Sequence, residues 1–258
     1  MGAKLGGVQF YDDLADYYDL IFPEWESSMA RQAAAISEVL IAQGPRRSAA
    51  GFRVLDVAAG IGTQALPLAS LGFEVTARDL SARAIARLRR EAASRGVTMG
   101  LGQADMREVR DSVSGSFDAV ICFDNSLPHL LTDADIKKAL AAFHELLAER
   151  GVLLLSVRDY DQVDRSPDSR HPYGERNRGG RRFRLHQEWS WLDSAHYRTV
   201  FVIEERDGAD WTEVVRTTAQ YYAIPIPHLL SLMEESGFRS RVVTEVAFYQ
   251  PMLIGRRT

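Results

Sequence analysis

The sequence of 258 residues contains one cysteine, Cys122, which lies in an apolar run from residue 119 to 123. A single cysteine excludes an intramolecular disulfide and a zinc site built from several thiolates, and it is typical of a reducing compartment. No segment approaches 18 uninterrupted apolar residues, and the first nine residues lack the apolar stretch of a signal peptide. We therefore expect a cytoplasmic protein that does not span a membrane.

Neither sign of charge is in large excess, because 31 Lys and Arg face 35 Asp and Glu, for a net charge of −4. This balance argues against a protein whose main task is to bind nucleic acid. Hydrophobic residues make up 46% and charged residues 26%, which excludes a disordered or collagen-like chain. A chain of this length can bury a sizeable core without disulfides or metals, and we expect no metal site.

Predicted strands and helices alternate along the first part of the chain. The spacing of Trp25, Met29, Ala33, Ile36 and Leu40 predicts a helix over residues 24–43. Strands are predicted at 52–57, 73–77, 97–103, 117–123 and 151–157, and helices before Gly72, after the N-cap Ser81 and over 133–149. This alternation predicts a Rossmann-like, doubly wound α/β fold, with ligands at the carboxyl ends of the strands of a mostly parallel sheet.

After Arg158 the pattern changes to segments rich in Val, Thr, Tyr, Phe and Trp. They predict antiparallel strands over 183–192, 196–205 and 211–224, followed by a helix over 227–236 and two last strands at 241–248 and 252–255, which complete a seven-stranded sheet. The Arg-rich stretch from 170 to 184 is expected to be a solvated loop, and the alternative is a site for an anionic substrate or RNA. We predict a single domain over 1–258, with an N-terminal helical lid (10–50), a cofactor-binding core (51–160), an inserted antiparallel β-rich cap (173–224) and the end of the core sheet (225–258).

Gly60 and Gly62 stand between a predicted strand and a predicted helix, where a ligand needs residues without Cβ so that the backbone can approach it. With Ala65 in third place and Asp79 at the end of the next strand, the segment also satisfies the dinucleotide-binding pattern. An NAD-type oxidoreductase is therefore an alternative. Asp56, four residues before Gly60, favours instead a ligand that carries positive charge and no phosphate.

The order of Asp56, Gly60, Gly62 and Asp79 resembles that of the class I S-adenosylmethionine-dependent methyltransferases, over roughly residues 10 to 160. S-adenosylmethionine carries an ammonium and a sulfonium, which suits an acid near the glycine loop. The resemblance implies that Asp79 binds the ribose hydroxyls. It also implies that Asp105 reads the adenine amino group beside the backbone amide of Met106, and that Arg31 binds the methionyl carboxylate. The expected cofactor-binding residues are Arg31, Asp56, Ala58, Gly60, Gly62, Asp79, Leu80, Asp105, Met106 and Phe123. The alternative for Asp56 and Asp105 is that they only cap turns at strand ends.

Two further segments, residues 124–130 and 155–161, resemble the glycine N-methyltransferase and glycine/sarcosine methyltransferase group. The resemblance implies that Arg158 holds the carboxylate of the substrate and that Tyr160 lies in the same site, whereas Val157 and Asp159 depart from the pattern of the group. A guanidinium at the end of a central strand is also suited to bidentate carboxylate binding on physical grounds. The alternative is an ion pair with Asp124, Asp159 or Asp161.

The candidate catalytic residues are Asn125, His129 and Tyr18, and the candidate substrate-binding residues are Tyr17, Asn125, Arg158 and Tyr160. His129 is alternatively a structural hydrogen-bonding residue. Tyr17 and Tyr18 either border the transferred methyl group or anchor the lid.

The sequence thus predicts a methyltransferase that converts S-adenosylmethionine to S-adenosylhomocysteine and N-methylates a small amine or amino acid bearing a carboxylate. The alternatives are O- or C-methylation of a larger metabolite, the NAD-type oxidoreductase, and a module that binds S-adenosylmethionine without turnover. No base-flipping motif follows the strand at 117–123, which argues against a nucleic-acid methyltransferase. The acceptor, the number of methyl groups transferred and the formation of a homo-oligomer are left open.

Overall fold

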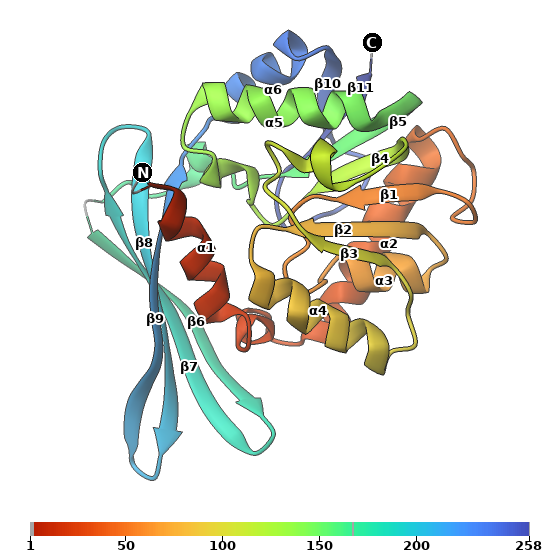
Figure 1. The fold of residues 1–258 in the computed structure, drawn as a ribbon. Coiled ribbons are helices and arrows are strands. Elements are labelled where there is room, and N and C mark those ends of the chain that lie inside the picture. Colours follow the sequence, from red (N-terminus) through yellow and green to blue (C-terminus); the bar gives the residue numbers. More distant parts are fainter. Residues whose placement is uncertain (1–2, 167, 258) are drawn as a thin grey trace.

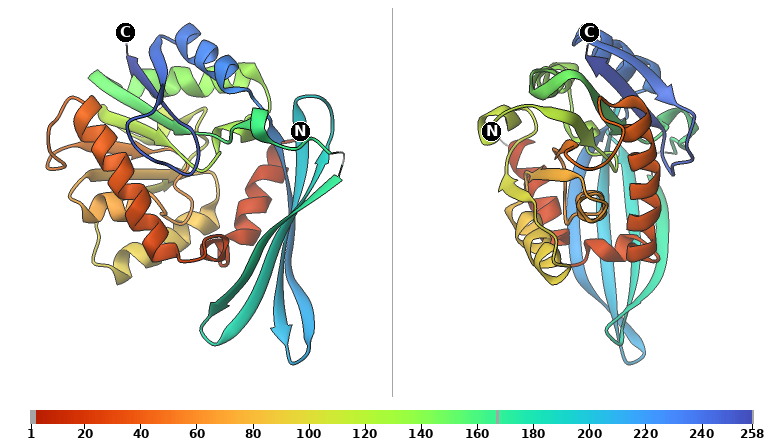
Figure 2. Two further views of the ribbon diagram at one scale, coloured as in Figure 1. Left: turned by 180° about the vertical axis from the view of Figure 1, so that it is seen from behind. Right: turned by 90° about the vertical axis from the view of Figure 1, so that its right-hand side faces the viewer.

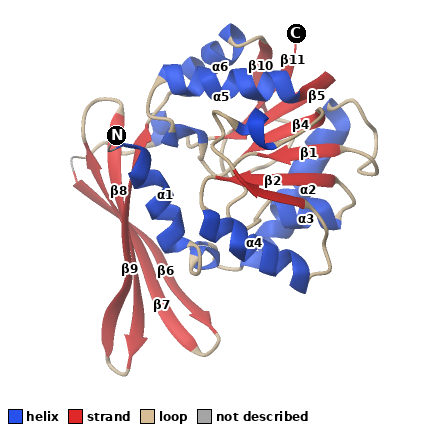
Figure 3. Ribbon diagram, in the orientation of Figure 1, coloured by secondary structure: helices blue, strands red, loops and turns tan. Residues whose placement is uncertain are grey.

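The computed structural model describes residues 3–166 and 168–257, which contain two separate sheets (Figures 1 and 3). The larger sheet has seven strands in the order β10-β11-β5-β4-β1-β2-β3. Its strands are β1 (Arg53–Asp56), β2 (Glu74–Asp79), β3 (Gly100–Gln103), β4 (Phe117–Cys122), β5 (Leu147–Ser156), β10 (Phe238–Val243) and β11 (Met252–Arg257). Strands β1 to β5 run parallel, and β11 is antiparallel to both of its neighbours. The predicted doubly wound, mostly parallel sheet is confirmed.

Helices cover both faces of this sheet, which is why every residue of its central strand β4 is buried (Figure 2). One face packs against α2 (Trp25–Gln43), α3 (Ala65–Ser70) and α4 (Ala82–Ser94). The other packs against α5 (Asp133–Leu146) and α6 (Ile226–Glu235). Ser81 caps α4 as predicted, because its Oγ accepts a hydrogen bond from the amide of Ala84 at 3.0 Å. Helix α5 ends at Leu146 rather than at residue 149, since Leu147 already begins β5.

The second sheet is antiparallel and has four strands, one more than the sequence predicted. Its strands are β6 (Asp168–Arg178), β7 (Arg181–Trp191), β8 (His196–Asp207) and β9 (Asp210–Tyr222), in that order. The expectation of a solvated loop over 170–184 is wrong, because this stretch forms the β6–β7 hairpin. Two of its arginines pair with acids elsewhere in the chain, Arg184 with Glu204 at 2.6 Å and Arg178 with Asp19 at 2.9 Å, and Arg182 pairs with Glu175 inside the hairpin.

The chain also contains an N-terminal helix that its sequence did not predict, α1 (Ala3–Leu14), followed by a short 3₁₀ turn over Tyr18–Ile21. Gly6 and Gly7 give this segment a poor intrinsic helix propensity. The helix is stabilised by tertiary contacts, since Phe10 and Leu14 are buried in the hydrophobic cluster that covers one face of the four-stranded sheet. In Figure 1, α1 lies between that sheet and the α/β core.

Among the helices of the described residues, none combines the length and the apolar character that crossing a membrane requires.

Candidate functional site

Two adjoining cavities lie at the carboxyl ends of the parallel strands. The first, the strand-end cavity, has a volume of about 940 Å³ and opens where the chain order reverses between β1 and β4, the place where doubly wound sheets bind ligands. Six of the ten expected cofactor-binding residues line it: Ala58, Gly60, Asp79, Leu80, Asp105 and Met106. The parallel strands thus bring residues up to 48 positions apart in the sequence to one wall of the cavity.

Asp79 connects the end of β2 to the glycine loop. Its Oδ2 accepts a hydrogen bond from the amide of Gly60 at 2.7 Å, and its Oδ1 accepts one from the amide of Ser81 at 2.8 Å. Burial raises the pKa of Asp79, and these two amide hydrogen bonds oppose that effect. Each carboxylate oxygen keeps a further lone pair, so Asp79 can still accept hydrogen bonds from a vicinal diol in the cavity.

The two loop glycines have different surroundings. Gly60 has φ +53°, and a Cβ built on it meets no atom within 4 Å, so its backbone is open to a ligand. Gly62 has φ +101°, and its Cβ would lie 2.4 Å from Leu88 Cδ1 and 2.7 Å from Leu66 Cδ1. Gly62 lines neither cavity, and its lack of a side chain lets the loop pack against these two leucines.

Asp56 and Phe123 also lie outside both cavities. Asp56 is 2% exposed, its Oδ1 accepts a hydrogen bond from the amide of Ala58 at 3.2 Å, and its Oδ2 has no partner within the described chain. Burial raises the pKa of Asp56 to about 8. The ring of Phe123 packs edge-on against Phe248.

Asp105 holds its carboxylate in an ion pair with Arg107 at 2.6 Å, and Arg107 also contacts Asp135 at 3.1 Å. Burial raises the pKa of Asp105, but the hydrogen bonds from Arg107 outweigh it and leave this pKa below the ordinary value. Asp105 is therefore an anion that faces the strand-end cavity. Nowhere in residues 3–166 and 168–257 do three or more His, Cys, Asp or Glu side chains form a cluster that could hold a metal ion.

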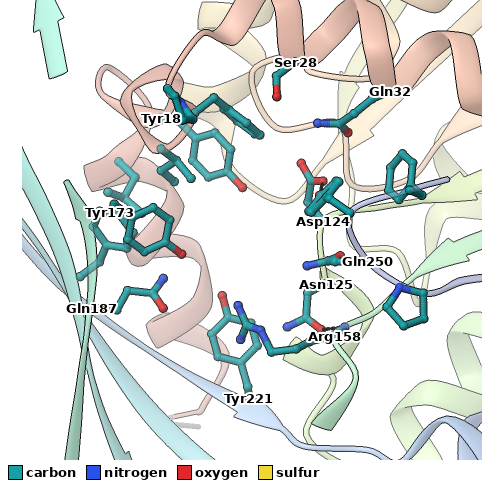
Figure 4. Close-up of a pocket in the computed structure, with 18 of the residues that line it drawn as sticks. Tyr18, Ser28, Gln32, Asp124, Asn125, Arg158, Tyr173, Gln187, Tyr221 and Gln250 are labelled. Carbon is teal, nitrogen blue, oxygen red and sulfur yellow. Dashed lines mark hydrogen bonds between the residues drawn. The ribbon is translucent and has the colours of Figure 1, made fainter. Parts of the chain in front are cut away.

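The second cavity, the cap cavity, has a volume of about 810 Å³ and lies between α1, the loops that follow β4 and β5, and the four-stranded sheet (Figure 4). It shares Tyr11, Tyr18 and Asp124 with the strand-end cavity. A molecule in one cavity can therefore meet a molecule in the other at Asp124. Of the residues singled out in the sequence, Arg31, Asn125, Tyr18 and Arg158 line the cap cavity.

Asp124 and Asn125 follow β4 with φ values of 57° and 62°, a left-handed conformation that residues other than glycine rarely adopt. Ser156 at the end of β5 holds them there, because its Oγ accepts from the amide of Asp124 at 2.9 Å and its carbonyl accepts from the amide of Asn125 at 3.2 Å. Burial raises the pKa of Asp124 to about 6, and a hydrogen bond from Gln64 opposes this rise. Tyr249 also donates a hydrogen bond to Asp124.

Arg158 presents its guanidinium to the cap cavity. Its Nη1 donates to the hydroxyl of Tyr197 at 2.8 Å, and the guanidinium lies 4.6 Å from the ring centroid of Trp189. Within the described part of the chain no carboxylate forms an ion pair with Arg158, so the predicted alternative of a pair with a neighbouring aspartate does not occur there. A largely buried guanidinium without an anion needs one, and the cavity is where an anion can reach it.

Asn125 is held by two hydrogen bonds that fix the orientation of its amide. Its Nδ2 donates to the hydroxyl of Tyr160 at 2.8 Å, and its Oδ1 accepts from the amide of Arg158 at 2.9 Å. One N–H of Asn125 remains for a ligand. Tyr160 is buried, lines neither cavity and acts on the site through Asn125 and through Tyr197, whose hydroxyl is 3.3 Å away.

The three remaining candidates lie at the N-terminal side of the site. Tyr18 borders both cavities, whereas Tyr17 lines neither and packs against Phe183. His129 lines the strand-end cavity, and its Nε2 forms a hydrogen bond of 2.7 Å with the hydroxyl of Tyr11. The imidazole also hydrogen-bonds the backbone of Gln220, so a neutral ring that donates there accepts at Nε2 from Tyr11. Burial lowers the pKa of His129 to about 4, so the imidazole is neutral near pH 7.

Several cavity residues escaped the sequence analysis because they come from α1 and the four-stranded sheet. They are Tyr11, Tyr173, Gln187 and Tyr221. Strand alternation was a usable signal for Gln187, which lies on the same face of β7 as the buried Leu185 and Trp189, and for Tyr221, which lies on the same face of β9 as the buried Ala219.

Comparisons with known proteins agree with this arrangement. The family model of a methyltransferase domain matches residues 54–151. The chain is 34% identical over 155 residues to a glycine/sarcosine N-methyltransferase of Parasynechococcus marenigrum (strain WH8102), which covers 60% of this chain and 52% of the relative. It is also 34% identical over 169 residues to a glycine/sarcosine N-methyltransferase of Halorhodospira halochloris, covering 65% of this chain and 58% of the relative. The chain thus spans little more than half the length of these two relatives.

Solved structures resemble the chain over nearly its whole length. The crystal structure of DesVI from Streptomyces venezuelae superposes with a TM-score of 0.79 and 20% identity, over 95% of this chain and 98% of that one. CalS10, an amino pentose methyltransferase from Micromonospora echinaspora, superposes with a TM-score of 0.74 and 22% identity, over 90% and 92% of the two chains. At such identities the likeness concerns the fold. Residues 54–151 thus match a methyltransferase domain, and both the relatives and the amino pentose methyltransferase that the chain resembles carry methyltransferase names.

Proposed function

We propose that the protein transfers a methyl group from S-adenosylmethionine to the nitrogen of a small acceptor that carries both an amine and a carboxylate. The observation that carries this proposal is Arg158, a guanidinium that faces the cap cavity with no carboxylate partner in the described chain. The relatives named glycine/sarcosine N-methyltransferases support the same acceptor class.

The strand-end cavity suits S-adenosylmethionine. Asp79 would accept hydrogen bonds from the ribose hydroxyls, Asp105 and Met106 would contact the adenine, and the open backbone of Gly60 would lie under the methionine part. Asp124 lies at the junction of the two cavities, where its charge would attract the ammonium of the cofactor. Arg31, exposed at the rim of the cap cavity, would bind the methionyl carboxylate.

When bound, the cofactor supplies an electrophilic methyl group on a sulfonium, whose departure as a neutral thioether needs no proton donor. The task of the protein is then to align the acceptor nitrogen and to exclude water. Arg158 would hold the acceptor carboxylate, and the free N–H of Asn125 would orient the acceptor beside it. The hydroxyls of Tyr11 and Tyr18 border both cavities, so they would face the path between nitrogen and methyl group.

The volume of the cap cavity supports a second candidate, an acceptor larger than a free amino acid. About 810 Å³ lies in the range of pockets that hold drug-sized ligands, and glycine would leave most of that volume empty. The structural neighbour named an amino pentose methyltransferase is consistent with a larger amine. In this candidate reaction Arg158 would bind another anionic group of the acceptor.

The test is the release of S-adenosylhomocysteine from S-adenosylmethionine with glycine or sarcosine as acceptor, against a blank without acceptor. We expect turnover above the blank, together with calorimetric binding of S-adenosylhomocysteine. Binding of S-adenosylhomocysteine without turnover on either amino acid would reject a free amino acid and favour the larger acceptor. Failure to bind S-adenosylhomocysteine would reject the methyltransferase proposal as a whole.

A further inference from the structure

Gln187 on β7 lines the cap cavity and is 8% exposed. Figure 4 shows it at the same end of the cavity as Arg158, Tyr173 and Tyr221, whereas Ser28 and Gln32 lie at the other end. Arg158 comes from the core, and Gln187 comes from the four-stranded sheet. This end of the cavity is therefore built from two parts of the fold that are far apart in sequence.

The orientation of the Gln187 amide is determined by its neighbour Trp189. The indole Nε1 of Trp189 donates a hydrogen bond to Gln187 Oε1 at 2.7 Å. An indole N–H can only donate, so the amide oxygen must face Trp189 and the amide nitrogen must face elsewhere. In the part of the chain that the structure describes, no group accepts a hydrogen bond from Gln187 Nε2.

Trp189 links this amide to Arg158. The indole of Trp189, which holds the Gln187 amide, also lies under the guanidinium of Arg158. The Cζ atom of Arg158 is 4.6 Å from the centroid of the Trp189 ring. One side chain of the four-stranded sheet thus positions both groups, and both present N–H donors to the cavity. The carboxylates that line the cap cavity, Asp124 and Asp159, come from the loops after β4 and β5 and not from the sheet that carries Gln187.

We propose that Gln187 determines acceptor specificity: its Nε2 donates a hydrogen bond to the carboxylate that Arg158 binds, so that the core and the four-stranded sheet hold this group from two sides. This inference rests on the proposed function and adds to it a residue that lies outside the sequence motifs. An acceptor with an uncharged group at this place would leave Arg158 and Gln187 without a partner, and the site would bind it poorly.

Acetate is the probe for this site, since it presents a carboxylate and nothing else. Its dissociation constant is measured at pH 7.5 by the chemical shift of its methyl protons, with the full-length protein saturated with S-adenosylhomocysteine. The variants are Gln187→Leu, which removes the donor, and Gln187→Glu, which keeps an oxygen for Trp189 but places a negative charge toward the acetate. Gln43→Glu is the matched control, because Gln43 ends α2 and lines neither cavity.

We expect Gln187→Leu to raise the dissociation constant of acetate about tenfold, as loss of a hydrogen bond to a charged group predicts. Gln187→Glu should raise it further, and Gln43→Glu should leave it unchanged. The dissociation constant of S-adenosylhomocysteine should stay within about twofold of wild type in all three variants, because Gln187 does not line the strand-end cavity.

Three outcomes would overturn the inference. If both Gln187 variants bind acetate as wild type does while Arg158→Leu does not, Arg158 alone forms the site, and the proposed function stands without Gln187. If both variants lose affinity for S-adenosylhomocysteine or unfold at lower urea concentration in step with the loss of acetate, Gln187 has a structural role. If the wild type binds S-adenosylhomocysteine but not acetate, the carboxylate site itself is wrong, and the proposed acceptor class falls with it.

Discussion

The carboxylate of Asp79 bridges two strand ends, because its Oδ2 accepts the amide hydrogen of Gly60, 2.7 Å away across the glycine loop. Gly60 follows β1 and Asp79 ends β2, so one side chain fixes the position of the loop relative to the neighbouring strand. The same carboxylate is the expected partner of the cofactor ribose. The conformation of the loop and the affinity for the cofactor therefore depend on the same atoms.

Replacing this carboxylate should weaken cofactor binding and lower stability together. In Asp79→Ala the amides of Gly60 and Ser81 lose their acceptor, so we expect the free energy of unfolding to fall by about 1–3 kcal/mol. The dissociation constant of S-adenosylhomocysteine, measured by calorimetry, should rise by at least about tenfold. Asp210→Ala, at an exposed position where β9 begins, is the control. Unchanged affinity for S-adenosylhomocysteine in Asp79→Ala would contradict the assignment.

The two loop glycines should respond differently to the same substitution. Gly62→Ala places a Cβ within 2.4 Å of Leu88, so it should destabilise the protein by more than about 2 kcal/mol in urea unfolding. Gly60→Ala meets no protein atom within 4 Å and should cost only about 1 kcal/mol for its positive φ, but it should reduce binding of S-adenosylhomocysteine markedly. Equal losses of stability in the two variants would argue against this division of roles.

Arg158→Leu should affect the acceptor and spare the cofactor. We expect the KM for the acceptor to rise by about tenfold or more, since a charged hydrogen-bonding partner of its carboxylate is lost. The dissociation constant of S-adenosylhomocysteine should change by less than about twofold, because Arg158 does not line the strand-end cavity. Arg158→Lys keeps the charge without the bidentate geometry, so its KM for the acceptor should lie between those of wild type and Arg158→Leu. Acceptor kinetics like those of the wild type in Arg158→Leu would refute the acceptor site.

Asp56 should make the ligand-free protein less stable as the pH rises. Burial raises its pKa in the folded state to about 8, whereas an unfolded aspartate titrates near about 3.9. Between these values the folded state binds more protons than the unfolded state, so the free energy of unfolding falls as the pH increases. From pH 6.5 to 8.0 we expect the free energy of unfolding of wild type to fall by about 1–2 kcal/mol more than that of Asp56→Asn, which lacks the titrating carboxyl group. Parallel urea-unfolding curves at both pH values for wild type and variant would contradict the expectation.

Tyr11 and His129 should be coupled energetically, because the Tyr11 hydroxyl is the donor to the buried Nε2 of His129. Tyr11→Phe leaves that nitrogen unpaired and should cost about 1–2 kcal/mol. A double-mutant cycle of urea unfolding measures the coupling. The loss in free energy of unfolding in the double variant, Tyr11→Phe with His129→Phe, should be about 1 kcal/mol smaller than the sum of the losses in the two single variants.

The pH dependence of kcat distinguishes the two roles considered for His129. A neutral His129 that only positions Tyr11 predicts no inflection from this residue in the pH dependence of kcat between pH 5 and 8. An inflection in that range that disappears in His129→Phe would assign the residue a proton-accepting role.

The sequence by itself was sufficient for the α/β core. The apolar strands at β1, β4 and β5, the caps and the glycine loop are local patterns, and a buried parallel sheet leaves few ways to connect them. The same local patterns place Asp79, Gly60 and Asp105 at strand ends, and parallel strands necessarily bring such ends to one edge.

Only the tertiary structure decided the other half of the site. Helix α1 contains two adjacent glycines and depends on its contacts with the four-stranded sheet, so no local signal predicted that Tyr11 would reach both cavities. Strand β6 is mostly polar, and its charged side chains have partners outside the strand: Glu175 pairs with Arg182 on β7, and Arg178 pairs with Asp19. Gln187 and Arg158 lie at the same end of the cap cavity, and that juxtaposition depends on packing between segments that are distant in the sequence.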